Sequence, residues 1–149
     1  MKAHRRIVVS KDSAGRSLIV DDRRVAEAES SNGNRYVVLW GGDGDSVSPG
    51  ASIQPPAMSL HPPPEGWRVV LLTFLPDTDR SSGRGMHATE SIDVVLVISG
   101  ELWLEVDDGT ETRLTAGTTV VQNATRHRWR NRSAQPATVA LLSVGPSRS

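Results

Sequence analysis

The stretch "AGTTVVQNATRHRWRNRS", residues 116–133, contains a run in which every second residue is an arginine. The run sets Arg126, Arg128, Arg130 and Arg132 against His127, Trp129 and Asn131. Successive side chains of a β-strand point to opposite faces of a sheet. The pattern therefore predicts a strand with two unlike faces. We predict that the arginine face meets solvent and that the His-Trp-Asn face points inward.

A basic ribbon that binds nucleic acid is the alternative interpretation of the same run. The whole chain of 149 residues has 17 Lys and Arg against 17 Asp and Glu, so its formal net charge is zero. Proteins dedicated to nucleic acid usually carry a basic surplus and interleaved aromatic residues. Only 4% of this chain is aromatic. We therefore expect no nucleic-acid partner.

Short apolar runs rich in Val, Ile and Leu, bounded by Gly, Pro, Asp or Ser, fill the rest of the chain. This pattern is typical of strands separated by turns, and many short strands indicate an all-β sandwich or barrel. Asp108-Gly109 predicts a tight hairpin, and 22–30 is the one helical candidate. The expected strands are Arg5–Ser10, Arg16–Asp21, Arg35–Trp40, Trp67–Leu75, Ile92–Ile98, Leu102–Val106, Thr112–Leu114, Thr118–Gln122, His127–Asn131 and Thr138–Val144.

The length predicts a single domain over residues 1–149. Within it we expect N-terminal strands and a Gly/Pro-rich segment in 1–66, followed by a barrel in 67–145. The segment 41–66 is crowded with Gly, Pro and Ser, and three interpretations stay open: a connector, a lid or an arm that crosses a dimer. The N-terminal half holds more strand material than one barrel needs, and exposed strand edges invite pairing between chains. We therefore predict a homodimer.

Targeting signals and cysteines bear on where the protein works. The chain has no cysteine, so a disulfide framework and a thiolate site are excluded. The N-terminal basic residues are not followed by the apolar segment of a signal peptide, and no apolar run is long enough to span a bilayer. We expect a cytoplasmic protein with no membrane partner.

The segment "GRGMHATESIDVVLVISGE", residues 83–101, carries the second informative histidine. It resembles the first motif of the cupin superfamily, G-x5-H-x-H-x3/4-E-x6-G. His87 stands at the first His, Thr89 at the second, Asp93 at the Glu and Gly100 at the closing Gly. The opening Gly falls on Ser81.

The segment 116–133 resembles the second cupin motif, in the form V-V-Q-x-G-T-x-H-x-W-x-N found in single-domain cupins. Ala124 replaces its Gly, and the matching positions are Val120, Val121, Gln122, Thr125, His127, Trp129 and Asn131. The resemblance covers about residues 80–145. It implies an antiparallel double-stranded β-helix, or jelly-roll barrel, that is usually a homodimer.

Cupins typically hold a metal with three histidines and a glutamate. The resemblance thus implies His87, Asp93 and His127 as ligands, with Thr89 in the place of the lost histidine. Two imidazoles and a carboxylate suit Fe(II), and would also hold Zn²⁺, Ni²⁺ or Mn²⁺. A metal-free barrel is the equal alternative. In it, the same three residues share hydrogen bonds and do acid–base work, because a histidine beside a carboxylate titrates near neutral pH.

Two functions remain open. The first is an enzyme acting on a small organic or polyketide-like metabolite inside the barrel, as oxygenase, isomerase, decarboxylase, dehydratase or cyclase. The second is a cupin without metal that binds or senses a small ligand without chemistry. In both, His87, Asp93 and His127 form the centre. Thr89, Gln122 and Trp129 contact the ligand.

Overall fold

The computed structural model describes residues 3–44, 58–77 and 85–147, and these residues contain strands and no helix. The predicted all-β class is confirmed, and ten of the observed strands overlap the expected ranges. The strands are β1(Ala3–Lys11), β2(Ser17–Ala26), β3(Ala28–Glu29), β4(Arg35–Gly42), β5(Trp67–Phe74), β6(Ile92–Ser99), β7(Glu101–Val106), β8(Glu111–Thr115), β9(Thr119–Asn123), β10(His127–Arg130) and β11(Ala137–Val144).

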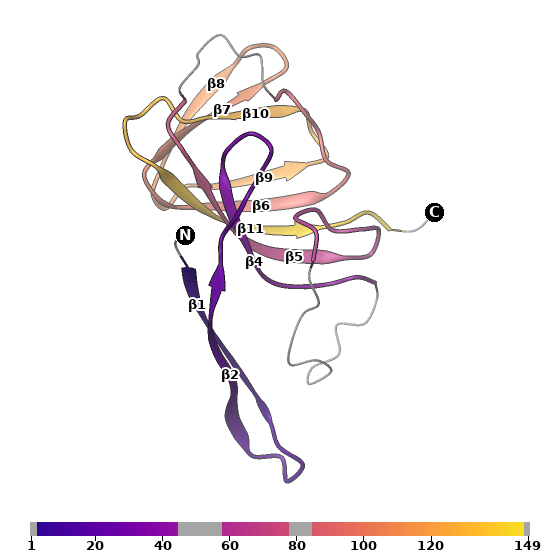
Figure 1. Ribbon diagram of the computed structural model, residues 1–149. Helices are drawn as coiled ribbons and strands as arrows, with labels where there is room; N and C mark the ends of the chain where they lie inside the picture. Colours follow the sequence, from indigo (N-terminus) through magenta and orange to yellow (C-terminus); the bar gives the residue numbers. More distant parts are fainter. Residues whose placement is uncertain (1–2, 45–57, 78–84, 148–149) are drawn as a thin grey trace.

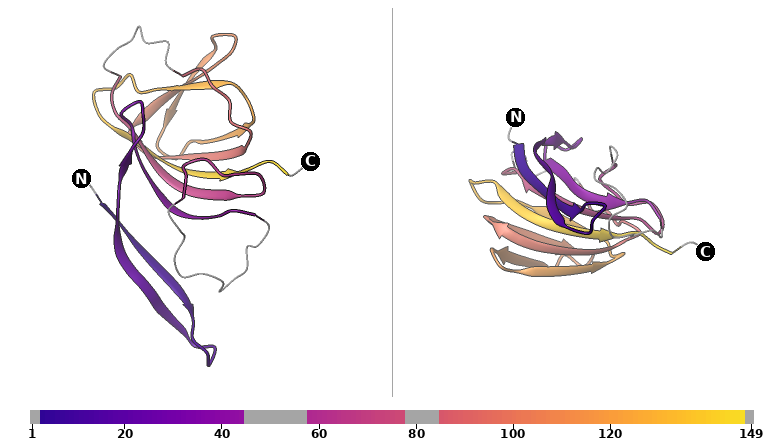
Figure 2. Two further views of the ribbon diagram at one scale, coloured as in Figure 1. Left: turned by 45° about the vertical axis from the view of Figure 1, so that its right-hand side comes forward. Right: turned by 90° about the horizontal axis from the view of Figure 1, so that it is seen from below.

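The strands form an antiparallel jelly-roll barrel with a projecting hairpin (Figure 1). One sheet has the order β3-β4-β5-β11-β6-β9 and the opposing sheet has the order β10-β7-β8. Since β3 and β4 extend the larger sheet, the barrel includes strands that precede residue 67. The hairpin β1-β2 is a separate two-stranded sheet that leaves the barrel (Figure 2). We call this hairpin, residues 3–26, the arm.

The core lies between the two barrel sheets. Leu102 and Leu114 face it from the smaller sheet, while Val95, Val97 and Val139 face it from the larger one, all of them at most 4% exposed. β7 and β8 meet at the predicted turn, where Gly109 has a φ of 79° and its N–H donates to the Val106 carbonyl. This positive φ favours glycine.

One row across the inner face of the larger sheet is polar instead of apolar. Register places Gln122 of β9 beside Asp93 of β6, Asp93 beside Ser143 of β11, and Ser143 beside Arg68 of β5. All four are at most 8% exposed. The next inward row consists of Val120, Val95, Leu141 and Val70. The barrel interior therefore changes from apolar to polar near one end.

The prediction of a helix at 22–30 is wrong. Residues 22–26 belong to strand β2, and Ala28–Glu29 form β3. Arg5 donates to both carboxylate oxygens of Asp22 at 2.8 and 2.6 Å, and Arg6 donates to Asp21 at 2.8 Å. The weak helix propensity of the Ala and Glu residues in this stretch is outweighed by strand pairing with β1 and β4 and by ion pairs.

The arginine face of β10 is only partly exposed to solvent, which corrects the prediction made from the sequence. Arg126 and Arg132 are exposed, but Arg128 is half-buried and Arg130 is only 8% exposed. All four arginines pair with carboxylates, as Arg126–Asp107, Arg128–Glu105, Arg130–Asp77 and Arg132–Glu111. The Arg128 guanidinium holds the pKa of the Glu105 carboxyl below its ordinary value. The alternating arginines therefore serve cross-strand and loop contacts.

Half of the Gly/Pro-rich segment, residues 45–57, lies outside the described residues, so its three interpretations stay open. Residues 41–42 end β4, and residues 58–66 run beside the larger sheet and are tied to it by Arg68. That guanidinium donates to the Ser59 and Gly42 carbonyls, each at 2.9 Å, and to Asp43 at 2.5 Å. His61 is exposed, as expected for a loop residue.

Candidate functional site

His87 and His127 lie side by side. They form an isolated antiparallel bridge, in which the His87 N–H donates to the His127 carbonyl at 3.0 Å and the His127 N–H donates to the His87 carbonyl at 2.9 Å. Directly opposed residues of an antiparallel pair have their side chains on the same face. The ring centroids are 4.6 Å apart. The two motif histidines, 40 positions apart in the sequence, are therefore one structural pair.

Each imidazole is oriented by a nearby backbone carbonyl. Nδ1 of His87 lies 2.5 Å from the Gly85 carbonyl oxygen, and Nδ1 of His127 lies 2.8 Å from that of Thr125. A carbonyl oxygen only accepts, so each Nδ1 must carry the proton. In the neutral rings both Nε2 atoms then keep a lone pair. Such an Nε2 can accept a proton or bind a ligand.

The two histidines differ in their surroundings. His127 is 3% exposed, whereas His87 is exposed. Burial lowers the pKa of His127 below its ordinary value of 6.5; the neighbouring His87 lowers it further, and the Thr125 hydrogen bond and Asp93 oppose this shift. His127 is thus neutral at neutral pH, with its Nε2 lone pair available.

Asp93 sits in a network of hydroxyl groups. Ser143 Oγ and Ser91 Oγ donate to its Oδ1 at 2.6 and 2.9 Å, and Thr89 Oγ1 donates to Oδ2 at 3.3 Å. Thr89 and Asp93 therefore lie side by side. Ser91 and Ser143 were missed by the sequence analysis. Ser143 had a signal: it is a polar residue at an inward position of β11, in line with Val139 and Leu141.

Gln122 is buried beside Asp93, and its Nε2 has no hydrogen-bond partner among the residues that the structure describes. It is 5% exposed. A buried amide without a partner costs about 1–3 kcal/mol. This amide can therefore donate to an acceptor that is not part of the chain.

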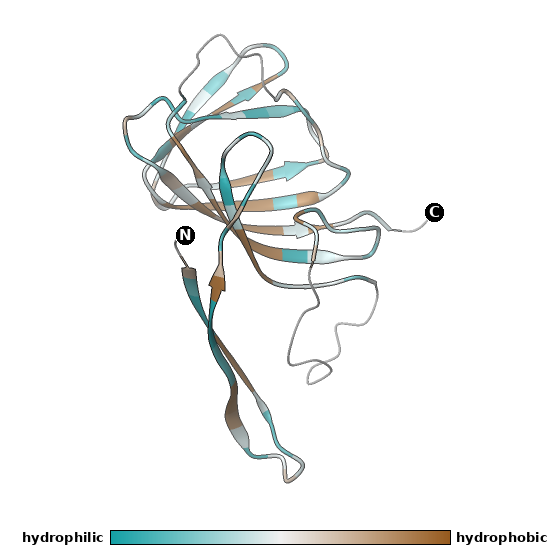
Figure 3. Ribbon diagram, in the orientation of Figure 1, coloured by the Kyte–Doolittle hydropathy of each residue, from teal (hydrophilic) through white to brown (hydrophobic). Residues whose placement is uncertain are grey.

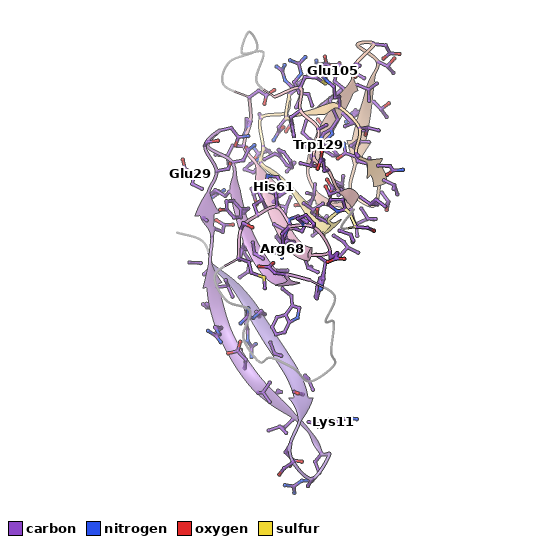
Figure 4. All side chains as sticks on the ribbon, turned by 90° about the vertical axis from the view of Figure 1, so that its right-hand side faces the viewer. Lys11, Glu29, His61, Arg68, Glu105 and Trp129 are labelled. Carbon is purple, nitrogen blue, oxygen red and sulfur yellow. The ribbon has the colours of Figure 1, made fainter. Side chains whose placement is uncertain are left out.

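Trp129 belongs to the barrel (Figure 4), where it packs against the core and next to His127. Its ring centroid is 6.0 Å from that of His127, edge to face, and 6.0 Å from that of Phe74. It therefore forms a wall next to the histidine pair. Asn131, the last motif residue, has a structural role: its Nδ2 donates to the Phe74 and Gln135 carbonyls at 3.0 and 2.8 Å.

The predicted metal ligands do not fit a metal in this geometry. Throughout residues 3–44, 58–77 and 85–147, no group of three or more His, Asp or Glu side chains is placed to hold a metal ion. His87 and His127 are adjacent, but the Asp93 carboxylate is occupied by three hydroxyl groups. A two-imidazole pair lacks the third protein ligand of catalytic zinc and non-haem iron sites.

A known protein family matches the part of the chain that contains these site residues. The family model of the cupin domain matches residues 70–145, about half of the chain. The chain belongs to the cupin family. This confirms the resemblance of the two motifs. None of the elements that the structure describes in this cupin is a helix long and apolar enough to cross a membrane.

Curated relatives match a short part of this cupin. Phomopsin biosynthesis cluster protein C' of Diaporthe leptostromiformis is 50% identical over 48 residues, which are 32% of this chain and 25% of that protein. Oryzines biosynthesis cluster protein J of Aspergillus oryzae is 45% identical over 47 residues, 32% of this chain and 26% of that protein. The cupin thus spans about a quarter of the length of these relatives.

Solved structures similar to this cupin include a cupin 2 conserved barrel domain protein from Salinispora arenicola CNS-205. It has a TM-score of 0.48 and 16% identity, and the match covers 76% of this chain and 77% of that chain. The cupin domain of an XRE family transcriptional regulator from Enterobacter cloacae has a TM-score of 0.43 and 27% identity, and the match covers 54% of this chain and 82% of that chain.

Proposed function

We propose that this cupin binds a small organic molecule bearing a carbonyl group and catalyses a proton transfer on it with the His87–His127 pair. The observation that carries the proposal is the adjacent position of two imidazoles whose Nδ1 atoms are both held by backbone carbonyls. Both rings then offer Nε2 for chemistry. Proton transfer by a positioned histidine is a common way to accelerate a reaction.

In the proposed step, Nε2 of His127 removes a proton from a carbon next to the ligand carbonyl. The C–H electron pair forms a carbon–carbon double bond and the carbonyl π pair moves to the oxygen, which gives an enolate to which the Gln122 amide donates. The His127 imidazolium then gives this proton to a second position of the ligand, either directly or through Nε2 of His87, so both rings end neutral. No oxidant or reductant is consumed, so the step fits isomerisation, dehydration or cyclisation.

The proposed roles of the neighbouring residues follow from their contacts. Asp93, held by Ser91 and Ser143, stabilises the imidazolium formed on His127 through its charge. Thr89 fixes that carboxylate, and Trp129 forms an apolar wall for the ligand. The relatives named for phomopsin and oryzines biosynthesis clusters support a secondary-metabolite substrate.

The second candidate is a binding cupin without catalysis. It is favoured by the incomplete metal-ligand set and by the hydroxyl groups that occupy Asp93. In that case Gln122 and Trp129 select the ligand, and the histidines act only as hydrogen-bonding groups.

Exchange of ligand hydrogen for solvent deuterium distinguishes the two candidates. Carbonyl-bearing metabolites that raise the melting temperature are incubated with the protein in D₂O, and deuterium incorporation is followed by mass spectrometry. We expect incorporation with the native chain, its loss with His127→Ala and with His87→Ala, and its retention with Arg128→Gln, which lies on the same strand but points outward. Stabilisation without incorporation by the native chain supports the binding candidate instead.

A chelator experiment tests the metal-free part of the proposal. Dialysis against EDTA should leave deuterium incorporation unchanged. Loss on dialysis and recovery on addition of Fe(II), Zn²⁺, Ni²⁺ or Mn²⁺ would contradict it.

A further inference from the structure

Asp93 differs from the other charged side chains in the described interior because it has no charged partner there. Within residues 3–44, 58–77 and 85–147, the buried Asp, Glu and Arg side chains are Glu27, Arg68, Asp93 and Arg130. Three of them form ion pairs, which are Glu27–Arg35, Arg68–Asp43 and Arg130–Asp77. Asp93 is 8% exposed, and its hydrogen bonds to described residues all come from hydroxyl groups. Since buried charges are normally paired, this pattern indicates a cationic partner from outside the chain.

The hydroxyl groups around Asp93 leave both its charge and one acceptor position available. Oδ1 accepts from Ser143 at 2.6 Å and from Ser91 at 2.9 Å, whereas Oδ2 accepts from Thr89 at 3.3 Å. A carboxylate oxygen has about two acceptor positions, so Oδ2 can take one more donor. Neutral hydroxyl groups do not cancel a negative charge. A cationic donor is therefore favoured over a neutral one at Oδ2.

Asp93 lies in the ligand site on the inner face of the barrel. Burial lowers the pKa of the nearby His127, and the charge of Asp93 acts against this lowering. Across the strands Asp93 is paired with Gln122, whose buried Nε2 has no partner among the described residues. Figure 3 shows hydrophilic stretches that interrupt the hydrophobic strands of the larger sheet. The unpaired charge and the unpaired amide donor are therefore direct neighbours.

Arg68 lies in the same inward row but does not neutralise Asp93. Its guanidinium donates to the Ser59 and Gly42 carbonyls, each at 2.9 Å, and to Asp43 at 2.5 Å. Its charge is thus used at the segment 58–66. A metal ion is the other kind of counter-ion, but across the described residues no group of three or more His, Asp or Glu is placed to hold one. The charge of Asp93 is therefore available to a ligand.

Asp93 and Gln122 together present two different groups to that ligand. Directly paired residues of antiparallel strands have Cβ atoms about 4.5–5.5 Å apart. Asp93 offers an anionic acceptor, and Gln122 offers a neutral donor. The complementary ligand carries a cationic donor and a carbonyl oxygen on adjacent or nearly adjacent carbons.

We propose that the ligand of this cupin is an amino carbonyl compound, whose protonated amine binds Oδ2 of Asp93 while its carbonyl oxygen accepts from Nε2 of Gln122. The inference rests on the proposed function in one respect, because it places the ligand beside the histidine pair. A protonated amine neutralises the charge of Asp93, whereas a carboxylate ligand brings a second negative charge close to it. The proposed proton transfer keeps the site neutral, since the imidazolium and the enolate form together.

Three probes of similar shape and different charge test this inference. Phenacylamine carries a protonated amine next to a ketone, phenacyl alcohol a neutral hydroxyl group in its place, and phenylglyoxylate a carboxylate. Isothermal titration calorimetry is done with EDTA in the buffer, at a pH where the amine is protonated. Phenacylamine should bind about ten- to a hundredfold more tightly than phenacyl alcohol, the range that a hydrogen bond to a charged group supplies, and phenylglyoxylate should bind most weakly. Equal affinity for the first two probes, tighter binding of the anion or no binding of phenacylamine would overturn the proposal.

Substitutions then assign the charge preference to one residue. Asp93→Asn should abolish the preference for phenacylamine while phenacyl alcohol still binds. Glu90→Gln removes the same charge from an exposed position three residues away and should keep the preference. Gln122→Leu should weaken both probes alike, because both carry the carbonyl group. A preference that survives Asp93→Asn, or one that is lost with Glu90→Gln, contradicts the role of Asp93.

Two further measurements keep this test independent of folding and of catalysis. Circular dichroism shows whether each variant is folded, and the probe ranking of the native chain decides the matter if Asp93→Asn is not. Tight binding of phenacylamine without deuterium incorporation retains the charge preference and removes the proton transfer. Deuterium incorporation into phenacyl alcohol with no preference for phenacylamine retains the proton transfer and overturns the present inference.

Discussion

Strands β10 and β1 both combine arginines with side chains suited to a protein interior, but they bury these side chains to different extents. In β10, HRWR, Arg alternates with His and Trp, whereas in β1, AHRRIVVSK, two arginines precede the apolar run of residues 7–9. In β10 the inward histidine, His127, is 3% exposed, whereas Val9 of β1 is 63% exposed. β10 belongs to a sheet that faces a second sheet across the core, and β1 has only β2 beside it. Alternation therefore defines two faces of a strand, but a second layer decides whether either is buried.

Truncating the apolar side chain on each strand should give the largest contrast. Trp129→Ala removes a ring packed against Phe74 and the core, so we expect the free energy of unfolding to fall by about 3 kcal/mol. Val9→Ala should change the stability of the dilute monomer by no more than about 0.5 kcal/mol. Urea unfolding followed by circular dichroism measures both. Equal losses would show that the arm is packed against its own barrel.

The arginines of β10 should not be equivalent to each other. Arg130 is 8% exposed and donates to Asp77 at 2.6 Å, so Arg130→Gln leaves a partly buried carboxylate without its partner. We expect a loss of about 1–2 kcal/mol, less than for a fully buried ion pair. Arg128→Gln, with a half-buried side chain, should cost no more than about 0.5 kcal/mol. If urea unfolding gives the same loss in free energy of unfolding for Arg128→Gln and Arg130→Gln, the difference in burial between the two arginines does not determine their contribution to stability.

The lowered pKa of His127 predicts a stability change with pH. Between the folded pKa and the ordinary value of about 6.5, the unfolded chain binds the proton more readily than the folded chain. The free energy of unfolding should therefore fall as pH drops below about 6.5, until the folded pKa is reached. His127→Gln should remove this part of the pH dependence, and His61→Gln, at an exposed loop position, should retain it. An identical pH profile for the native chain and His127→Gln would contradict the burial effect.

The smallest expected effect is at Ala124, between β9 and β10. Ala124 has a φ of 50°, in the left-handed region, at the position where the resembling motif has glycine. The left-handed conformation costs an L-residue roughly 1–2 kcal/mol, and glycine gives part of that back as unfolded-state entropy. We expect Ala124→Gly to stabilise the protein by about 0.5 kcal/mol in urea unfolding. A destabilised Ala124→Gly would show that the Ala124 methyl group contributes to packing.

Local patterns were enough to predict the barrel strands. Runs such as "VVLVI" at 94–98 and the turn at Asp108-Gly109 act over a few residues, so their structure depends little on distant contacts. The stretch 22–30 was predicted wrongly because it is short, and its Ala and Glu residues favour a helix only weakly. Residues 22–26 pair with β1 and Ala28–Glu29 pair with β4, and a pairing between separate strands is not visible in the composition of either strand.

The sequence alone determined the all-β class, the two faces of β10 and the pairing of two motif histidines with one site. The first two follow from the pattern of side chains along a linear chain, and the third from the resemblance of the two motifs to those of cupins. Only the tertiary structure decided that Asp93 accepts hydrogen bonds from Ser91, Ser143 and Thr89, that Arg130 is buried, and that Val9 and Val121 are exposed. Each depends on which strands become neighbours and which layer covers them, because burial and hydrogen bonding are set by residues far apart in the sequence.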